Sequence, residues 1–426
     1  MAFKQGRIPL SEAHTARLAL LIGRGIIASA QIGKAIISIP MIRAEMSLSL
    51  AVAGLVVAIF ATIGATTGIG AGVVVKRIGT RRALIAGMFA IAIGNTVGAT
   101  APNEAWLLVG RIIEGVGFFG VVLAIPSMLS AIVKVQERDF VMALWSAYMP
   151  AGITLMLLCG PLLLAIGWRN LWFGSAVVAA SCGILAIIFA PKFADPTPPI
   201  AKRFFSDVAI VVRDRSCVLL AFAFFLFSCQ IFSMAFALPI LLSSERGLGL
   251  GAAGLLSAAV MAVSTIGHVS SGFFLRAGVP IWANIGVAFG GFAVSAVIFY
   301  SGALPPFGMA LIAAFALAIG GLAPGALYAA APRVAPNPQS VPPTIGLLQQ
   351  ASNLGQFAGP VALGAWAQHL GWSAAPFIVA PAALCGLTAA FLIRRTMTLS
   401  SRKETLQPAD TSENAPQEGL IGSRPV

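Results

Sequence analysis

Long apolar runs dominate this sequence and decide what it can fold into. Stretches of roughly 20 residues with few charges recur along most of the chain, and each is long enough for a helix to cross a lipid bilayer. The runs are too long and too continuous for the strands of a membrane barrel. We therefore predict an all-α polytopic membrane protein. Its twelve expected spans lie near 17–40, 49–75, 83–101, 105–133, 140–166, 171–191, 217–242, 249–275, 281–301, 307–331, 344–368 and 373–393.

The few charges of the chain predict its orientation. Only 10% of the 426 residues are Asp, Glu, Lys or Arg, against about 25% in a soluble domain. If both termini are cytoplasmic in an inner (plasma) membrane, most of the 27 basic residues fall inside, and only Arg43, Arg169 and Arg246 fall outside. This split obeys the positive-inside rule. Topology thus accounts for the net charge of +13, and no nucleic-acid partner is expected.

A proline-rich connection near the middle of the chain separates the spans six and six. It contains Pro196, Pro198 and Pro199, which favour a linker over a continuous helix. The expected parts are a cytoplasmic N-terminus over 1–16, a six-helix bundle over 17–191, a cytoplasmic linker over 192–216, a second six-helix bundle over 217–394 and a disordered cytoplasmic tail over 395–426.

Short patterns recur in the same order in the two halves, at nearly the same spacing. Such parallel repeats are typical of one class of transporter, in which two pseudo-symmetric bundles enclose a substrate site near the middle of the membrane. The recurring pairs are Gly72 with Gly272, Lys76 with Arg276, Gly79 with Gly278, Gly160-Pro161 with Gly359-Pro360, and Gly167-Trp168 with Gly371-Trp372.

Three motifs resemble signatures of the major facilitator superfamily. The loop from Gly72 to Arg82 resembles the signature G-x-L-x-D-R-x-G-R-R/K, the segment from Leu108 to Gly117 resembles the second signature, and Gly160-Pro161 the third. The resemblance covers about 15–395 and implies the major facilitator fold, with two bundles that rock in alternating access. It also implies gating roles for Gly72, Lys76, Arg77, Gly79, Arg81 and Arg82.

One residue departs from the first signature. Lys76 stands where the signature has Asp, an acid that in the family helps to lock the cytoplasmic side. The cytoplasmic gate is therefore expected to be built differently here or to be weaker.

Two further segments are similar to the cyanate and nitroimidazole permease branch of that superfamily. They are Ala124–Ser127 leading to Ala143–Ala147, and Pro40–Glu45. The Arg-Pro pair of that branch has no counterpart near Ser29, so its substrates are not carried over to this chain.

The first span carries a polar stripe. Arg24, Gln31, Lys34 and Ser38 fall within an arc of about 80° at helical spacing. A charge in the middle of a span needs a reason, and we expect the stripe to face a central cavity as a cationic wall for an anionic or strongly polar substrate. The alternative is that Arg24 and Lys34 snorkel toward opposite membrane interfaces.

A single acid, Glu114, is expected inside the membrane, one turn from Arg111. Such a pair either locks the fourth span to its neighbours or takes part in proton coupling. His268 is a further coupling candidate, although a lone histidine equally serves packing. With Arg24, Lys34 and Arg111 against one acid, the intramembrane charge favours an anionic cargo.

Other polar or aromatic residues in the spans are secondary candidates for substrate binding. Gln349, Asn353 and Gln356 share one helix face, which lines a cavity or provides hydrogen bonds between helices. The secondary candidates are Trp145, Tyr148, Gln230, Gln349, Gln350, Asn353 and Gln356.

No catalytic constellation is present in the sequence. The 3 histidines have no second ligand nearby and there is no phosphate-binding loop, so we expect no enzyme activity, no metal and no cofactor. We predict a monomeric secondary active transporter in the lipid bilayer that moves a small polar, anionic organic solute, coupled to protons or a counter-substrate. The alternatives are an exporter of drugs or hydrophobic compounds and a non-transporting substrate sensor, which the replacement of the signature acid by Lys76 would suit.

Overall fold

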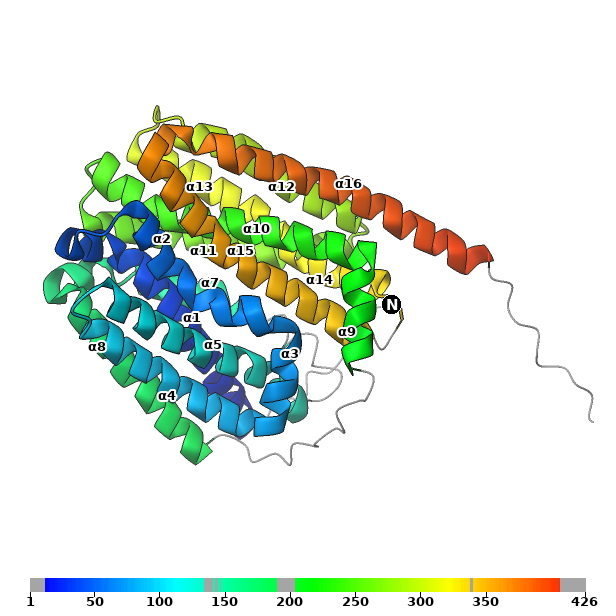
Figure 1. Cartoon of the computed structure of the whole chain (residues 1–426), viewed down its shortest axis with the longest axis horizontal. Coiled ribbons are helices and arrows are strands. Elements are labelled where there is room, and N and C mark those ends of the chain that lie inside the picture. Colours follow the sequence, from blue (N-terminus) through cyan, green and yellow to red (C-terminus); the bar gives the residue numbers. More distant parts are fainter. Residues whose placement is uncertain are drawn as a thin grey trace, which may run out of the picture.

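The computed structural model describes residues 12–133, 141, 145, 147–189, 204–337 and 340–406. All regular elements in this part of the chain are helices (Figure 1). Residues 1–11 of the predicted N-terminus, residues 192–203 of the linker and the last twenty residues of the tail lie outside the described residues.

The N-terminal half begins with a long helix, α1, and its shorter helices start where the sequence provides caps. The Ser49 side chain accepts a hydrogen bond from the backbone of Val52 at the start of α2, and Asn103 caps α5 in the same way. The helices are α1 (Glu12–Met46), α2 (Leu50–Ala58), α3 (Thr62–Ile78), α4 (Thr80–Ala99), α5 (Glu104–Ile132), α7 (Tyr148–Leu157) and α8 (Gly160–Phe189).

The C-terminal half begins with a short helix that belongs to the expected linker. The last helix runs past residue 395, where the tail was expected to begin, because no Gly or Pro interrupts the chain between Gly386 and Pro408. The helices are α9 (Phe204–Arg213), α10 (Arg215–Ile240), α11 (Leu250–Arg276), α12 (Ile281–Tyr300), α13 (Pro306–Gly320), α14 (Leu322–Val334), α15 (Val341–Leu370) and α16 (Pro376–Leu406).

The helices account for all twelve predicted spans. Within the described residues, 10 segments are long and apolar enough to cross a membrane. One of them, α8, consists of two helices divided at Gly167, whose positive φ of 78° is a conformation that glycine adopts readily. α8 therefore contains the end of the fifth span and the whole sixth span. The fifth span starts in α7, and the 30-residue α15 is the eleventh. The twelve-helix prediction is confirmed.

The two halves meet through helices that the repeat relates to one another. α2 and α3 pack on α15, while α11 packs on α7 and α8. A Cβ atom added at Gly54 would lie 2.4 Å from the carbonyl oxygen of Pro360, and one at Gly254 would lie 3.0 Å from the Cα of Gly160. Figure 1 shows the blue and cyan N-terminal helices beside the C-terminal ones, which run from green to orange.

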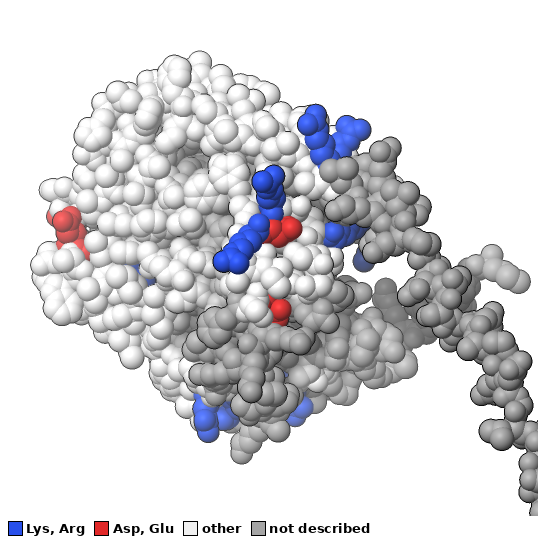
Figure 2. Space-filling model, turned by 45° about the vertical axis from the view of Figure 1, so that its right-hand side comes forward, with Lys and Arg blue, Asp and Glu red and all other residues white. Residues whose placement is uncertain are grey.

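Basic residues gather at one end of the bundle. Arg82 lies at the start of α4, Arg215 at the start of α10, Arg276 at the end of α11 and Arg333 at the end of α14. Since successive spans run in opposite directions, these positions share one end of the molecule. Figure 2 shows blue basic side chains on the end that carries α9. This arrangement follows the pattern predicted from the sequence.

Candidate functional site

The polar stripe of α1 faces the inside of the N-terminal bundle. Gln31, Lys34 and Ser38 are at most 1% exposed, and their side-chain partners on other helices lie on α4, α5 and α8. In this structure these three side chains contact helices of their own bundle, and they do not line a cavity between the halves. The reason is physical, because α4 and α5 supply the acceptors that a buried ammonium group requires.

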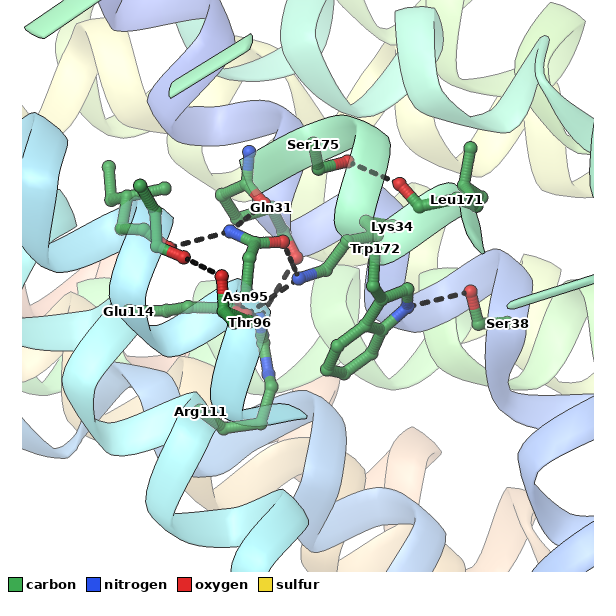
Figure 3. Close-up of polar contacts among 12 residues, drawn as sticks. Gln31, Lys34, Ser38, Asn95, Thr96, Arg111, Glu114, Leu171, Trp172 and Ser175 are labelled. Atoms are coloured by element: carbon green, nitrogen blue, oxygen red, sulfur yellow. Dashed lines mark hydrogen bonds and ion pairs between the residues drawn. The ribbon is translucent and has the colours of Figure 1, made fainter. Parts of the chain in front are cut away.

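Lys34 lies at the centre of this cluster (Figure 3). Its Nζ donates one hydrogen bond to Asn95 Oδ1 at 2.5 Å and another to Glu114 Oε1 at 2.6 Å. The same nitrogen lies 3.7 Å from the centroid of the Trp172 ring. The ammonium group thus has two oxygen acceptors and one aromatic face.

Arg111 holds the opposite side of the same carboxylate. Its Nη1 is paired with Glu114 Oε2, as the i, i+3 spacing predicted, and also donates to the Gln31 carbonyl at 3.1 Å. Its Nε donates to the Val56 carbonyl at 3.0 Å. All three charged side chains are 0% exposed, so two cations share one carboxylate inside the bundle. We call Lys34, Arg111 and Glu114 the ionic cluster.

A second set of hydrogen bonds orients the partners of Lys34. Asn95 Nδ2 donates to Gln31 Oε1 at 3.0 Å and to the Ile91 carbonyl at 2.8 Å, which turns Asn95 Oδ1 toward Lys34. The indole of Trp172 donates to Ser38 Oγ at 3.1 Å. Sequence reasoning missed both Asn95 and Trp172. Asn95 could have been found, since it is the one amide in the apolar third span.

Small residues bring the cluster's helices close together. A Cβ atom at Gly94 would lie 2.6 Å from the Gly110 carbonyl oxygen and 2.7 Å from Glu114 Cγ. A Cβ atom at Gly98 would lie 2.4 Å from the Trp172 ring. These glycines let α4 pack directly on α5 and α8, which places Asn95 beside Glu114.

Arg24 lies apart from the ionic cluster. It is 3% exposed, and it donates to the carbonyls of Cys182 at 3.4 Å and Leu20 at 3.2 Å. Its Nη2 has no hydrogen-bond partner in the described part of the chain. The sequence analysis grouped Arg24 with Lys34, whereas the structure gives them separate surroundings.

Aromatic side chains from both halves come together near the interface. Trp145 stacks on Tyr148 at 4.2 Å, and Phe224 meets Tyr328 edge to face at 5.2 Å. Tyr148 belongs to the N-terminal half and Tyr328 to the C-terminal half, and the two phenol groups are close enough to interact electrostatically. Tyr328 also donates to Gln349 Oε1 at 2.7 Å. We call Trp145, Tyr148, Phe224 and Tyr328 the aromatic group; three secondary candidates, Trp145, Tyr148 and Gln349, meet here.

The remaining amide candidates differ in their surroundings. Asn353 donates to the Gln349 carbonyl at 2.7 Å, and Gln356 donates to Ser352 Oγ at 3.3 Å, so both bonds lie within α15 and neither joins two helices. Gln230 is 2% exposed, and neither of its amide atoms has a partner among the described residues. Gln350 donates to the Ala65 carbonyl at 2.9 Å, so this candidate joins the two halves.

The expected gating residues and the third coupling candidate, His268, lie elsewhere. Gly79, with φ of 94°, forms the turn between α3 and α4, and Arg81 donates to the Ile187 carbonyl at 2.5 Å. The side chains of Lys76 and Arg77 lie outside the described residues. His268 sits on α11 in the other half and contacts the Ser264 carbonyl at 2.9 Å, away from the ionic cluster. Within the described chain, no group of three His, Cys, Asp or Glu is placed to hold a metal ion.

Comparisons with known proteins place this arrangement in a family. The chain is 33% identical over 129 residues to the major facilitator superfamily multidrug transporter mfsC of Aspergillus fumigatus, covering 29% of this chain and 24% of that protein. It is 33% identical over 114 residues to the efflux pump notK of an Aspergillus species, covering 25% of this chain and 19% of that protein. The chain thus spans about a quarter or less of these curated relatives.

A solved structure matches almost the whole chain. It is a bacterial homolog of the human lysosomal transporter Spinster in an inward-facing, unoccupied conformation, with a TM-score of 0.70, 17% identity, and coverage of 94% of this chain and 100% of that one. At this identity the likeness concerns the fold alone. A sequence profile described as Major Facilitator Superfamily matches residues 21–337. Since that match spans well over half of the chain, the protein belongs to the Major Facilitator Superfamily of membrane transporters.

Proposed function

We propose that this chain is a secondary active transporter in which the ionic cluster couples the movement of cargo to protons by alternating access. The observation that carries the proposal is that Lys34 and Arg111 share the carboxylate of Glu114 at 0% exposure. Charges held in a low dielectric respond strongly to the gain or loss of one proton. Rocking of the two halves would change the access of water to such a cluster.

We place the cargo at the aromatic group, between the halves. Trp145, Tyr148 and Tyr328 offer ring faces with polar edges, and Gln349 adds an amide. Such a surface suits an amphipathic organic compound with a planar part. The names of the two relatives, a multidrug transporter and an efflux pump, support this class of cargo, which the sequence analysis held as an alternative.

A second candidate cargo is a small organic anion, the class first predicted from the sequence. It is favoured by the surplus of one positive charge in the ionic cluster, since a carboxylate would compensate it. It requires the cluster to open toward the cargo.

The basic residues at one end of the helices support an orientation with both termini in the cytoplasm of a cell bounded by this membrane.

The test uses reconstituted protein and a pH-sensitive dye trapped inside the vesicles. Compounds that raise the melting temperature of the purified protein are first selected from matched sets of neutral amphiphiles, organic anions and hydrophobic cations. We expect a selected neutral amphiphile to drive proton flux in the wild type and in Glu104→Gln, an exposed acid of α5, but not in Glu114→Gln. Bound compounds that never cross the membrane would contradict transport and favour the sensor.

A further inference from the structure

We propose that Lys34, rather than Glu114, is the group that takes up and releases the coupled proton, with Asn95 and Trp172 as its positioning residues. The inference rests on the proposed function and goes further by naming the proton carrier. From the sequence alone, Lys34 was expected to bind the cargo, and Arg111, Glu114 and His268 were expected to serve coupling.

The charge of the ionic cluster distinguishes the two carriers. With all three groups ionised, the cluster has two positive charges and one negative charge, and its side chains are 0% exposed. Protonation of Glu114 would raise the buried charge from one to two, whereas loss of a proton from Lys34 would leave the cluster neutral. A neutral cluster costs least to bury.

Arg111 cannot take this role. A guanidinium group keeps its proton in proteins, and Arg111 is held by Glu114 Oε2 and by the carbonyls of Gln31 and Val56. A lysine amine does exchange its proton when it is buried, which is why lysines serve as bases in enzymes. Of the two cations, Lys34 is therefore the one that can change its charge.

The surroundings of Lys34 stabilise the ammonium form in this conformation. Asn95 Oδ1 and Glu114 Oε1 accept two of its protons at 2.5 and 2.6 Å, and the ring of Trp172 lies 3.7 Å from the nitrogen. Asn95 and Trp172 are themselves fixed by Gln31 and Ser38. These contacts suit the proton-loaded state, and Figure 3 shows the Lys34 amine pointing toward Asn95 and Glu114.

Among the described residues, only two charged groups act on Lys34. The charges that act on Lys34 are those of Glu114 and Arg111, both on α5. α2 has no titratable side chain, and α4 contributes only the neutral amide of Asn95 to the cluster. The other titratable or charged groups on the helices that pack against α1 are Glu104 on α5, Tyr148 on α7, Arg169 and Cys182 on α8, and Arg215, Cys217 and Cys229 on α10.

The step balances with one proton and no other reactant. When water reaches the cluster, the Nζ–H bond of Lys34 breaks, its electron pair stays on the nitrogen, and the proton passes to water. Lys34 becomes a neutral amine beside the neutral Arg111–Glu114 pair. Uptake of a proton from the other side of the membrane restores the ammonium and its two hydrogen bonds.

Trp172 provides a probe that needs no cargo, because its ring lies directly against Lys34. The emission of the full chain, which has 7 tryptophans, is recorded against pH in lipid nanodiscs, and the signal of Trp172→Phe is subtracted. We expect a one-proton step in the wild type that is lost in Lys34→Arg and retained in Glu114→Gln. Lys34→Arg keeps the positive charge, so a fold defect is not expected to account for the loss.

Three outcomes overturn the inference: no step in the wild type, a step that survives in Lys34→Arg, or a step lost in Glu114→Gln while Lys34→Met retains it. Proton flux in vesicles tests the proposed function separately. Cargo-driven flux that is unchanged in Lys34→Arg overturns the role of Lys34 and leaves the proposed function standing. A fluorescence step with no flux for any cargo overturns the proposed function, and with it coupling, while Lys34 remains the titrating group.

Discussion

The first helices of the two halves share a sequence pattern, but their polar residues differ in hydrogen bonding. Gln31-Ile32 of α1 recurs as Gln230-Ile231 of α10, and the prolines that follow, Pro40 and Pro239, have the same spacing. Gln31 is bonded to Asn95, whereas both amide atoms of Gln230 lack a partner in the described chain. The two halves therefore share this sequence pattern, whereas, among the described residues, the repeated glutamine has a hydrogen-bond partner in the N-terminal half only.

The fourth helices of the halves show the same contrast. α5 carries Arg111 and Glu114, and α13, its counterpart, has buried alanines such as Ala313 and Ala316 on its inner face. The ionic cluster thus lies within one bundle and does not join the two. Rocking of the halves would then leave its ion pairs intact, so the proposed coupling would act through access of water or cargo to the cluster.

The largest effect is expected from removal of the single acid of the cluster. Glu114→Gln leaves Lys34 and Arg111 buried without a counter-charge, which costs about 3–5 kcal/mol when one partner of a buried pair is lost. Thermal or denaturant unfolding of the purified protein measures it. No neutralisation of an acid in the C-terminal half is expected to match it, because none of the described acids of that half is buried.

A matched control lies on the same helix. Glu104 is exposed in the first turn of α5, so Glu104→Gln should cost less than about 1 kcal/mol. Equal losses of stability in Glu104→Gln and Glu114→Gln would mean that the buried cluster does not stabilise the N-terminal half more than an exposed acid does.

The next effect concerns the two interfaces that the repeat relates. Gly54→Ala would place a methyl group 2.4 Å from the Pro360 carbonyl oxygen, whereas the closest atom to a methyl at Gly254 is the end of the Ile37 side chain at 2.8 Å. We expect Gly54→Ala to cost about 1–3 kcal/mol by overpacking and Gly254→Ala to cost less, because a side-chain tip yields more easily than backbone. Unfolding measurements compare the two.

Gly174→Ala is the control for these variants. Gly174 lies in a helix with nothing within 4 Å of an added Cβ, so alanine there should be neutral or slightly stabilising. If Gly54→Ala behaves like Gly174→Ala, the halves do not press together at Pro360 as tightly as the structure indicates.

Much of the fold was predictable because span length and charge asymmetry are read directly from the sequence. The break at Gly167 was among the predicted features, since the fifth span was expected to end at 166 and the sixth to begin at 171. The end of α16 was missed, because polar helix-forming residues up to Leu406 were taken as the composition of a disordered tail.

The site was predictable only in part. Helical spacing identified Gln31, Lys34 and Ser38 as one stripe, and the pairing of Arg111 with Glu114. It did not predict which neighbour the stripe faces, since periodicity gives a direction relative to the helix and not to the bundle. The close approach of α4 and α5 depends on glycines such as Gly94, whose role appears only once the helices are packed.

The same substitution at the two repeated glutamines should have opposite signs. Gln31→Met removes a hydrogen bond and leaves Asn95 Nδ2 with one acceptor fewer, which should cost about 1 kcal/mol. Gln230→Met removes an unsatisfied buried amide and should stabilise by about 1 kcal/mol. Melting temperatures of the two variants test the comparison. A loss of stability in Gln230→Met would mean that its amide has a partner, such as water, that the contacts described above do not include.

The smallest effect is expected where the two halves agree. Ser29 of α1 donates to the Tyr148 carbonyl of α7 at 2.7 Å, and Ser228, at the matching position of α10, is bonded to Ser352 of α15 at 2.8 Å. Each joins the first and fifth helices of its half, and each alanine variant should cost about 0.6 kcal/mol, the usual contribution of a hydrogen bond between membrane helices. Equal losses of stability in Ser29→Ala and Ser228→Ala would place the asymmetry of the halves in the ionic cluster and in Gln230. Losses that differ by more than about 1 kcal/mol would extend the asymmetry to the helix contacts that the repeat preserved.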